Sequence, residues 1–349
     1  KVLDSLTTSL QVEGRELFVS GSVGITLYPR DGTEMGTLLK NADTAMYRAK
    51  ERGPGTFFFF TPELNRQAEE HLAMEHDLRG ALAREELHLH YQPQVRIEDG
   101  RLVGLEALLR WNRGGTPESP GRFIPVLEET GLIGPVGEWC VREACRQLRL
   151  WRRSGLEDLR VAVNLSARQF QDQRILEVIR EALDRHELPG DALEIEITES
   201  TLLDVSTAST SAARLQQMGV RLAIDDFGTG YSSLTYLKRF SVDTLKVDRS
   251  FVRDIPIDAD DAVIAEAIVA LGDSLDLEVV AEGVETAEQL LFLRQRRCSL
   301  AQGFHVCPPL AADELSAWLD CQQRRHDGAY WRPAGPAAAP ARRRRLTAS

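Results

Sequence analysis

Residues 222–226 read Leu222-Ala223-Ile224-Asp225-Asp226, an apolar, strand-like run that ends on two adjacent acids. Side chains alternate between the two faces of a strand, so Asp225 shares a face with the small Ala223 while Ile224 points the other way. A small residue below a polar one is typical of the interior of a barrel, where space is tight. The run therefore favours a barrel strand that delivers carboxylates to one end.

The same pattern recurs on both sides of this run. Six further short apolar runs each end on a charged or amide side chain: Glu106, Asn164, Glu196, Lys246, Glu282 and Gln302. Longer amphipathic segments separate the runs as far as about residue 322, which indicates alternating strands and helices in a parallel α/β fold. The length of this region, roughly 240 residues, is the usual size of a TIM barrel.

Polar residues at the carboxyl ends of barrel strands usually serve chemistry rather than stability. One buried acid would more often be part of a structural ion pair, but seven polar strand ends in phase favour a functional site. Such a site would bring up to five carboxylates together, with Lys246 as its one cation. Like charges raise each other's pKa values unless a cation neutralises them.

The donors at these strand ends are oxygen atoms, with no His or Cys among them. Oxygen donors favour Mg²⁺ or Mn²⁺ over zinc. Five carboxylates exceed the need of a single Mg²⁺, and the adjacent Asp225 and Asp226 could serve two ions. A two-metal centre activates water for attack on a phosphodiester.

Composition narrows the class of protein further. The formal net charge of −11 argues against a general nucleic-acid binder. Five cysteines with no C-x-x-C pair indicate reduced thiols rather than disulfides or a zinc site. No stretch approaches the ~18 apolar residues that span a bilayer. We expect a cytoplasmic protein. Because the first residue is Lys1, we also expect a longer protein, in which an upstream region could carry a membrane anchor.

Three segments lie outside the strand repeat. Residues 1–61 form a small α/β unit that ends in the apolar run 57–60, which we interpret as a buried strand rather than an exposed interface. Helical spacing over 62–86 predicts one long linker helix. Residues 326–349 are rich in Ala, Pro and Arg and predict a disordered tail. The H-x-H pair His88 and His90 has no third ligand at useful spacing, which favours a structural role.

At the strand ends the sequence resembles the EAL-domain family of cyclic di-GMP phosphodiesterases, over about residues 72–325. The name motif stands here as Glu106-Ala107-Leu108-Leu109-Arg110. A single EAL tripeptide would be weak support, but an ordered set is specific. The other runs that carry the resemblance are Tyr91-Gln92-Pro93, Asn164-Leu165-Ser166, Glu196-Ile197-Thr198-Glu199, Asp225-Asp226-Phe227-Gly228-Thr229-Gly230, Leu245-Lys246-Val247-Asp248, Ala281-Glu282-Gly283-Val284-Glu285 and Gln302-Gly303-Phe304.

Residues 1–61 resemble the C-terminal part of a GGDEF (diguanylate cyclase) domain. The matching runs are Tyr28-Pro29-Arg30-Asp31-Gly32 and Ala42-Asp43-Thr44-Ala45-Met46-Tyr47-Arg48-Ala49-Lys50. The GGDEF signature itself is not in this sequence, nor is the half that would hold GTP. We therefore expect no cyclase activity from this chain.

The resemblance implies a TIM-like (β/α)8 barrel whose first strand, near residues 88–95, runs antiparallel to the rest. It implies two Mg²⁺ or Mn²⁺ ions on Glu106, Asn164, Glu196, Asp225, Asp226 and Glu282. Lys246 and Glu282 are the alternatives for positioning or deprotonating the attacking water. The implied substrate contacts are Gln92, Leu108, Arg110 and Gln302. The residues implied to support the loop after Asp226 and the edge of the site are Glu199, Asp248 and Glu285.

The implied reaction is metal-dependent hydrolysis of cyclic di-GMP to linear pGpG by an activated water. Family members commonly pair through their EAL domains, so a homodimer is expected. A rival is a cyclic di-GMP receptor that binds without turnover and signals through a protein partner. Degenerate members of that kind usually lack a metal ligand, whereas every ligand position is filled here. A different metal-dependent enzyme on the same scaffold is the third alternative.

Overall fold

The structure is a computed structural model of the 349-residue chain. It describes residues 3, 10–12, 15–17, 20–53, 55–203, 205–230, 237, 240–255 and 257–325. The chain divides into two units, residues 1–80 and 81–349, which are described separately.

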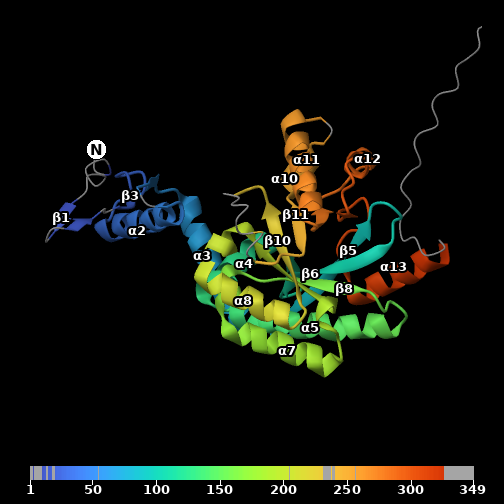
Figure 1. Ribbon diagram of the computed structural model, residues 1–349. Helices are drawn as coiled ribbons and strands as arrows, with labels where there is room; N and C mark the ends of the chain where they lie inside the picture. Colours follow the sequence, from blue (N-terminus) through green and yellow to red (C-terminus); the bar gives the residue numbers. More distant parts are fainter. Residues whose placement is uncertain are drawn as a thin grey trace, which may run out of the picture. The chain divides into compact units, whose positions relative to one another are not determined.

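A closed barrel forms the frame of residues 81–349 (Figure 1). Within the described ranges its strands are β5 (Leu87–Arg96), β6 (Leu102–Arg113), β8 (Arg160–Asn164), β9 (Leu193–Thr198), β10 (Arg221–Phe227), β11 (Thr244–Val247), β12 (Glu278–Ala281) and β13 (Leu300–Ala301). From β6 to β13 each strand pairs in parallel with the next. The apolar strand runs predicted from the sequence are thus neighbours in one sheet.

Strand β5 closes the barrel and runs antiparallel to both of its neighbours, β6 and β13. Its register places Gln92 opposite Glu106 and Val95 opposite Ala301. The eight-stranded, TIM-like barrel with an antiparallel first strand is therefore confirmed. Two short strands extend the sheet: β7 (Thr116–Glu118) pairs with β6, and β14 (Leu310–Ala311) pairs with β5.

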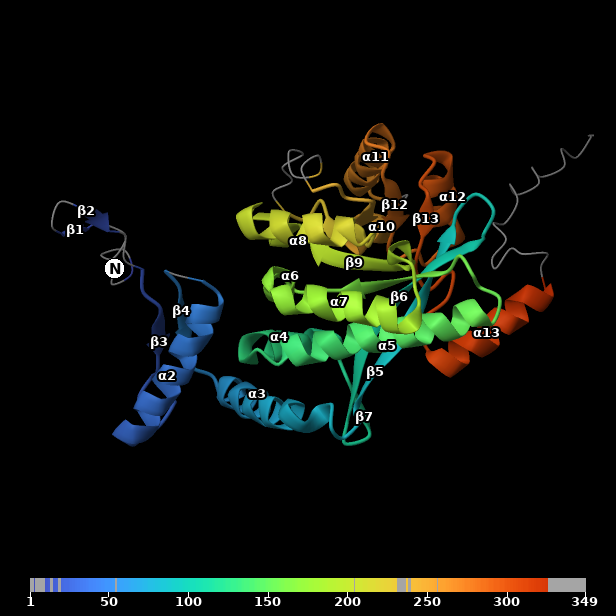
Figure 2. The ribbon, with the colours of Figure 1, turned by 60° about the horizontal axis from the view of Figure 1, so that its bottom comes forward.

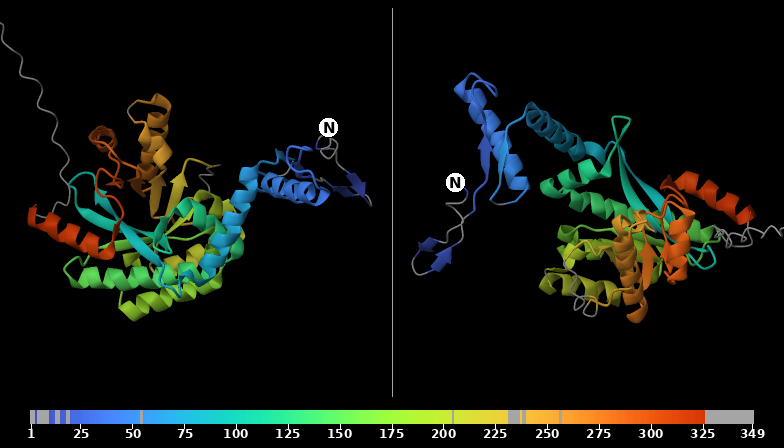
Figure 3. Two further views of the ribbon diagram at one scale, coloured as in Figure 1. Left: turned by 180° about the vertical axis from the view of Figure 1, so that it is seen from behind. Right: turned by 90° about the horizontal axis from the view of Figure 1, so that it is seen from above.

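Helices cover the outside of the barrel. Figure 2 shows α5, α7 and α8 side by side, with α10, α11 and α12 over the later strands. The C-terminal helix, red in Figure 3, packs against β5. Among the described residues the helices of this unit are α4 (Pro120–Thr130), α5 (Ile133–Arg153), α6 (Ala167–Gln171), α7 (Gln173–His186), α8 (Val205–Gln217), α10 (Arg249–Arg253), α11 (Ala259–Ser274), α12 (Ala287–Gln295) and α13 (Ala312–Arg325), with 3-10 turns at Gly190–Ala192 and Glu199–Leu203.

Helix α5 shows why these segments are helical. Its buried residues Val141, Ala144, Cys145 and Leu148 recur three and four positions apart, so they form one apolar stripe against the sheet. Cys140 and Cys145 are free and buried, as expected, and burial raises the pKa of each thiol to about 12. Thiols with such pKa values are packing residues rather than reactive ones.

Helix caps fix how the chain leaves the strands. After β8, the Ser166 side chain accepts a hydrogen bond from the backbone nitrogen of Gln169, and Gln169 Oε1 accepts one from the backbone nitrogen of Ser166. Thr286 and Gln289 form the same capping box at the start of α12, shortly after β12. A capping box satisfies two backbone donors that would otherwise be orphaned. Each box thereby orients the short loop that follows a functional strand end.

Residues 1–80 form a smaller α/β unit. Strands β1 (Leu10–Val12) and β2 (Arg15–Leu17) pair antiparallel, and β3 (Val23–Ile25) pairs in parallel with β4 (Phe57–Phe59). Helix α2 (Met35–Glu51) connects β3 to β4, and α3 begins at Pro62. Gly24 is required because a Cβ there would lie 1.9 Å from the carbonyl oxygen of Ala42 in α2.

Three expectations are corrected or bounded here. The apolar run 57–60 is not fully buried, because Phe57 and Phe59 are 54% and 48% exposed while Phe60 is buried. The expected linker helix over 62–86 ends at Ala81, and Glu85 then adopts a positive φ in the turn before β5. The tail predicted over 326–349 lies outside the described residues. The domain boundaries drawn from the sequence stay predictions. Among the described helices, none combines the length and apolar character needed to cross a membrane.

The stripe of α5 generates a stability prediction. Leu148 is fully buried, whereas Leu150 on the same helix is 48% exposed. We expect Leu148→Ala to lower the free energy of unfolding by about 2–5 kcal/mol, because it removes buried methyl groups and leaves a cavity. Leu150→Ala is the matched control, with an expected change of about 0.5 kcal/mol or less. Urea unfolding of both variants measures the difference, and equal losses would contradict the packing described.

Candidate active site

The predicted strand-end residues meet at one end of the barrel. Asn164, Asp225 and Lys246 lie at or near the carboxyl ends of β8, β10 and β11, and Glu282 and Gln302 directly follow β12 and β13. One expectation is corrected: Glu106 does not end its strand, because β6 continues to Arg113 as a hairpin with β5 and β7. Glu106 is nevertheless at the barrel rim, since the parallel pairing of β6 with β8 stops at Ala107.

Lys246 lies at the centre of the carboxylates. Its side chain is completely buried, and its Nζ atom contacts carboxylate oxygens from four different strands or strand ends. The distances are 2.6 Å to Glu282, 2.8 Å to Glu196, 3.1 Å to Asp225 and 3.5 Å to Glu106. Burial alone would lower the pKa of Lys246, but the carboxylates raise it well above its usual value. Lys246 is therefore a fixed cation.

Hydrogen bonds hold the Glu106 carboxylate from both sides. Asn164 Nδ2 donates to Oε1 at 2.7 Å, and Gln302 Nε2 donates to Oε2. Burial opposes ionisation of Glu106, but Lys246 and these two donors together lower its pKa. These contacts therefore favour the ionised form of Glu106.

The other buried acids carry more negative charge than Lys246 balances. Burial, followed by repulsion from Glu106, raises the pKa of Glu196 well above its usual value. Burial also raises the pKa of Glu282 to about 8, with Lys246 opposing the rise. Carboxylates with raised pKa values indicate a site that lacks positive charge.

Asp225 and Asp226 lie at a distortion of the sheet. Pairing between β10 and β11 shifts register between Ile224 and Phe227, and Asp226 has a φ of 54°. This irregularity turns both adjacent carboxylates toward the site instead of onto opposite faces. Burial, then the charge of Asp225 and contact with Asp248, raises the pKa of Asp226 to about 6.

The acids form two groups in which ligand oxygens lie within 4.8 Å of one another. One group contains Glu106, Glu196 and Asp225, and the other contains Asp225, Asp226 and Glu282. The buried Oε1 atom of Glu196 has no hydrogen-bond partner in the structure. An unpaired buried oxygen within an oxygen-only donor set fits a divalent cation. The predicted metal ligands are thus brought together, with Asp225 common to both groups.

The residues predicted to contact substrate continue from this cluster. Gln92 and Gln302 are buried and bonded to each other, with Gln302 Nε2 donating to Gln92 Oε1 at 3.0 Å. Leu108 and Arg110 follow Glu106 at alternate positions of β6, so they share its face beyond the rim. Burial lowers the pKa of Arg110, and the negative charge of Glu106 opposes this change.

Sequence reasoning assigned no site role to His88 and His90. The register of β5 with β6 places His90 opposite Leu108 and His88 opposite Arg110. Cross-strand partners lie on the same face of a sheet. The histidines therefore belong to the face that carries Gln92 and Glu106. The alternation His88, His90, Gln92 was the available signal, but reading it required the pairing partner.

The predicted supporting residues divide into two kinds. Glu199 Oε2 accepts from the backbone nitrogen of Gly228 at 3.4 Å, and Gly228 has the left-handed φ of 101° that glycine permits. Asp248 caps α10 and contacts Asp226. Glu285, in contrast, is exposed and pairs with Arg249 at 2.9 Å. The remainder of the loop, residues 231–236, lies outside the described residues.

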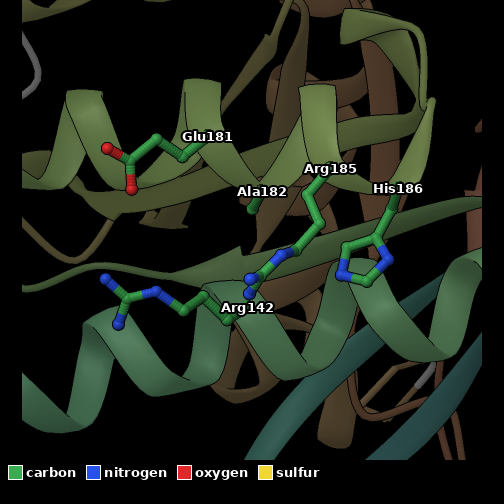
Figure 4. Close-up of a pocket in the computed structure, with 5 residues that line it drawn as sticks. All are labelled: Arg142, Glu181, Ala182, Arg185 and His186. Carbon is green, nitrogen blue, oxygen red and sulfur yellow. The ribbon is translucent and has the colours of Figure 1, made fainter.

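A separate hollow of about 300 Å³ lies on the outer surface, between α5 and α7 (Figure 4). Arg142 reaches it from α5, and Glu181, Arg185 and His186 line it from α7. None of the strand-end residues lines this hollow. It is therefore distinct from the carboxylate cluster.

Comparison with known proteins agrees with this geometry. The model of the EAL-domain family matches residues 75–309. The chain belongs to the EAL-domain family. The model of the diguanylate cyclase GGDEF domain matches residues 1–56, which supports a partial GGDEF unit before the EAL barrel.

Several curated relatives have functional names, MucR and PdeR among them. The chain is 46% identical over 322 residues to the bifunctional diguanylate cyclase/cyclic di-GMP phosphodiesterase MucR of Pseudomonas aeruginosa, covering 91% of this chain and 47% of that protein. It is 40% identical over 322 residues to the cyclic di-GMP phosphodiesterase PdeR of Escherichia coli, covering 91% and 48%. The chain thus spans about half the length of these relatives.

Among solved structures, the phosphodiesterase of P. aeruginosa MucR in complex with c-di-GMP matches with a TM-score of 0.68 and 48% identity. The match covers 70% of this chain and 99% of that one. The EAL barrel described above is therefore the fold of a solved relative.

The central position of Lys246 generates a prediction for the metal-free protein. We expect Lys246→Met, measured in EDTA, to lower the free energy of unfolding by about 3–5 kcal/mol, because it leaves buried carboxylates without their cation. Arg101→Met is the control, since Arg101 pairs with Asp158 on the surface and such pairs contribute about 1 kcal/mol or less. Chemical denaturation followed by circular dichroism measures both. Similar losses in the two variants would show that Lys246 does not hold the cluster.

Proposed function

We propose that this chain hydrolyses cyclic di-GMP to linear pGpG with two divalent cations. The observation that carries the proposal is the pair of carboxylate groups that share Asp225 around one buried lysine. The named activities of the EAL relatives supply the substrate. No other substrate class is favoured by a feature of the described residues.

Two Mg²⁺ or Mn²⁺ ions would be held by the two carboxylate groups, with Asn164 adding an amide oxygen to the first. When bound, such ions activate a water and stabilise the attacking and leaving oxygens of a phosphodiester. The excess of acids over cations in the site is the electrostatic reason to expect two ions rather than one.

The protein's own groups have separate tasks. Lys246 keeps its proton beside four carboxylates, so it donates hydrogen bonds and orients the attacking water. Glu282 lies 2.6 Å from Lys246 at the edge of the second group and is the candidate to accept the proton of that water. Of the two alternatives that the sequence left open, the proposal thus gives positioning to Lys246 and deprotonation to Glu282.

The hairpin beyond the rim would hold the substrate. Arg110 presents a planar fork of donors that suits a phosphate oxygen pair. The rest of the ligand would contact three residues near Arg110 and Glu106, namely Leu108, Gln92 and Gln302. The supporting roles of Glu199, Asp248 and Glu285 belong to the same proposal.

Turnover tests the proposal directly. With Mg²⁺ or Mn²⁺ we expect cyclic di-GMP to disappear and pGpG to accumulate. Chromatography of the reaction mixture measures both compounds over time. We expect Glu106→Gln to lower kcat by about a thousandfold or more, because a ligand of the first ion is lost. Glu98→Gln, an exposed acid in the turn between β5 and β6, is the matched control and should retain activity.

The receptor alternative gives a different result in the same assay. Binding of cyclic di-GMP without product, in both metals, would make the chain a receptor. Loss of activity in Glu98→Gln equal to that in Glu106→Gln would contradict the assignment of the site.

The number of ions is a separate prediction. Asp226 belongs only to the second carboxylate group. We therefore expect Asp226→Asn to bind one Mn²⁺ per chain where the unaltered protein binds two. Calorimetric titration of EDTA-treated protein measures the stoichiometry, with Asp99→Asn on the surface as the control. Two ions in Asp226→Asn would refute the ligand set of the second group.

Pairing of two chains through the EAL domain, and a cytoplasmic location, are also part of the proposed function. Both rest on the family resemblance. Sedimentation at several protein concentrations checks the first of them.

A further inference from the structure

The side-chain amide of Gln302 links the carboxylate site to the interior of the barrel. Its nitrogen donates to Glu106 Oε2 and to Gln92 Oε1, and its oxygen accepts from Gln94 Nε2 at 3.1 Å. All four side chains are buried. Within the described residues, Gln94 is the group that donates a hydrogen bond to Gln302 Oε1.

Two obligate acceptors determine how these amides are turned. A carboxylate such as Glu106 accepts but does not donate, so Gln302 must present its nitrogen there. Gln92 donates to the backbone oxygen of Cys307 at 3.1 Å, so its own oxygen must face Gln302. Both constraints point the oxygen of Gln302 toward Gln94. Gln94 is therefore obliged to donate, and its own oxygen must face away from the site.

The oxygen of Gln94 lies on the side of Gly104 and Arg160. Gln94 is opposite Gly104 in the β5–β6 pairing, and the point where a Cβ on Gly104 would lie is 2.8 Å from Gln94 Oε1 and 3.3 Å from Arg160 Nε. Both of these atoms are buried and have no hydrogen-bond partner among the described residues. The missing side chain of residue 104 thus leaves the Gln94 oxygen its place.

Arg160 is in turn held at the floor of the barrel. Its Nη1 atom is 2.7 Å from Glu278, which also pairs with Arg221. Arg221 is 3.1 Å from the completely buried Glu194. These residues come from the starts of β8, β9, β10 and β12, so the two arginines and two glutamates of the floor balance in charge.

We propose that Gln94 is a positioning residue for Glu106, acting through the amide of Gln302. Hydrogen bonds run in one direction from Gln94 through Gln302 to the carboxylate of Glu106. Partners that hold a metal-binding carboxylate commonly change metal affinity by about 10–100-fold when they are removed. The inference rests on the proposed function only in taking Glu106 as a metal ligand.

The test measures Mn²⁺ affinity and does not need turnover. We expect Gln94→Met to weaken Mn²⁺ binding to the EDTA-treated protein about 10-fold, because Gln302 loses its donor and no longer fixes Glu106. Electron paramagnetic resonance of free Mn²⁺ gives the dissociation constant. Gln147→Met, at a buried glutamine of α5, is the matched control and should leave the affinity unchanged.

A double-mutant cycle separates positioning from a general structural role. If Gln94 acts through Gln302, adding Gln94→Met to Gln302→Met should change the Mn²⁺ affinity by less than about twofold. Independent, additive losses would overturn the proposal. So would an unaltered affinity in Gln94→Met, or the absence of Mn²⁺ binding by the unaltered protein.

Gly104→Ala provides a second route that keeps all of the amides. The added methyl group would lie 2.8 Å from Gln94 Oε1 and displace it, so we expect weaker Mn²⁺ binding here too, including in the case that Gln94→Met does not fold. Tight, Gln94-dependent Mn²⁺ binding without hydrolysis of cyclic di-GMP would reject the proposed function and leave this inference standing. Hydrolysis of cyclic di-GMP, together with a Mn²⁺ affinity that neither substitution changes, would support the proposed function and reject this inference.

Discussion

The contacts of Lys246 are the constraint on which the rest of the site depends. A completely buried ammonium group is tolerated only where its charge is matched, and Lys246 has four carboxylates within 3.5 Å. The dependence is mutual, because Glu106 and Glu196 are buried and Asp225 and Glu282 are mostly shielded from solvent. The strands that supply these carboxylates must therefore keep their register, because a shift would separate the carboxylates from Lys246.

The two ends of the barrel solve the problem of buried charge differently. At the floor, Arg160 and Arg221 face Glu194 and Glu278, so cations and anions are equal in number. At the rim, one lysine faces more acids than it can neutralise, and burial, with the charges of Asp225 and Glu106, raises the pKa of Glu282 to about 8 although Lys246 opposes the rise. A network with equal numbers of cations and anions is neutral by itself, whereas an acidic one needs further positive charge. This contrast, rather than the presence of buried charge, distinguishes the functional end.

Much of the barrel could be predicted from the sequence because alternation along a strand is a local property. Asp225 above Ala223, and Asn164 above Ala162, already indicated which side chains face inward. Strand direction is not local, and the reversed first strand came only from the family resemblance. The end of α3 at Ala81 and the exposure of Phe57 depend on what each segment packs against, which periodicity does not contain.

The same distinction applies to the site. The carboxylates of the site were all predicted, because charged residues at strand ends stand out in the sequence. Gln94 was not, although it follows Gln92 by two residues on the same face of β5, because its role depends on Gln302 more than 200 residues away. His88 and His90 were assigned a structural role because no third metal ligand lies at useful spacing. Their register with Arg110 and Leu108 could not be predicted, because it is set by the hairpin.

The reversed direction of β5 determines at which end of the barrel the chain enters. In a barrel whose strands all run in parallel, the first strand begins at the floor, remote from the reacting groups. Here Leu87 pairs with Trp111, beyond Glu106 and the rim, so the polypeptide enters the barrel at its mouth. The first barrel strand thus runs from the rim toward the floor and brings Gln92 and Gln94 into the barrel in that order. The topology joins the preceding sequence to the barrel at the end that carries the carboxylates.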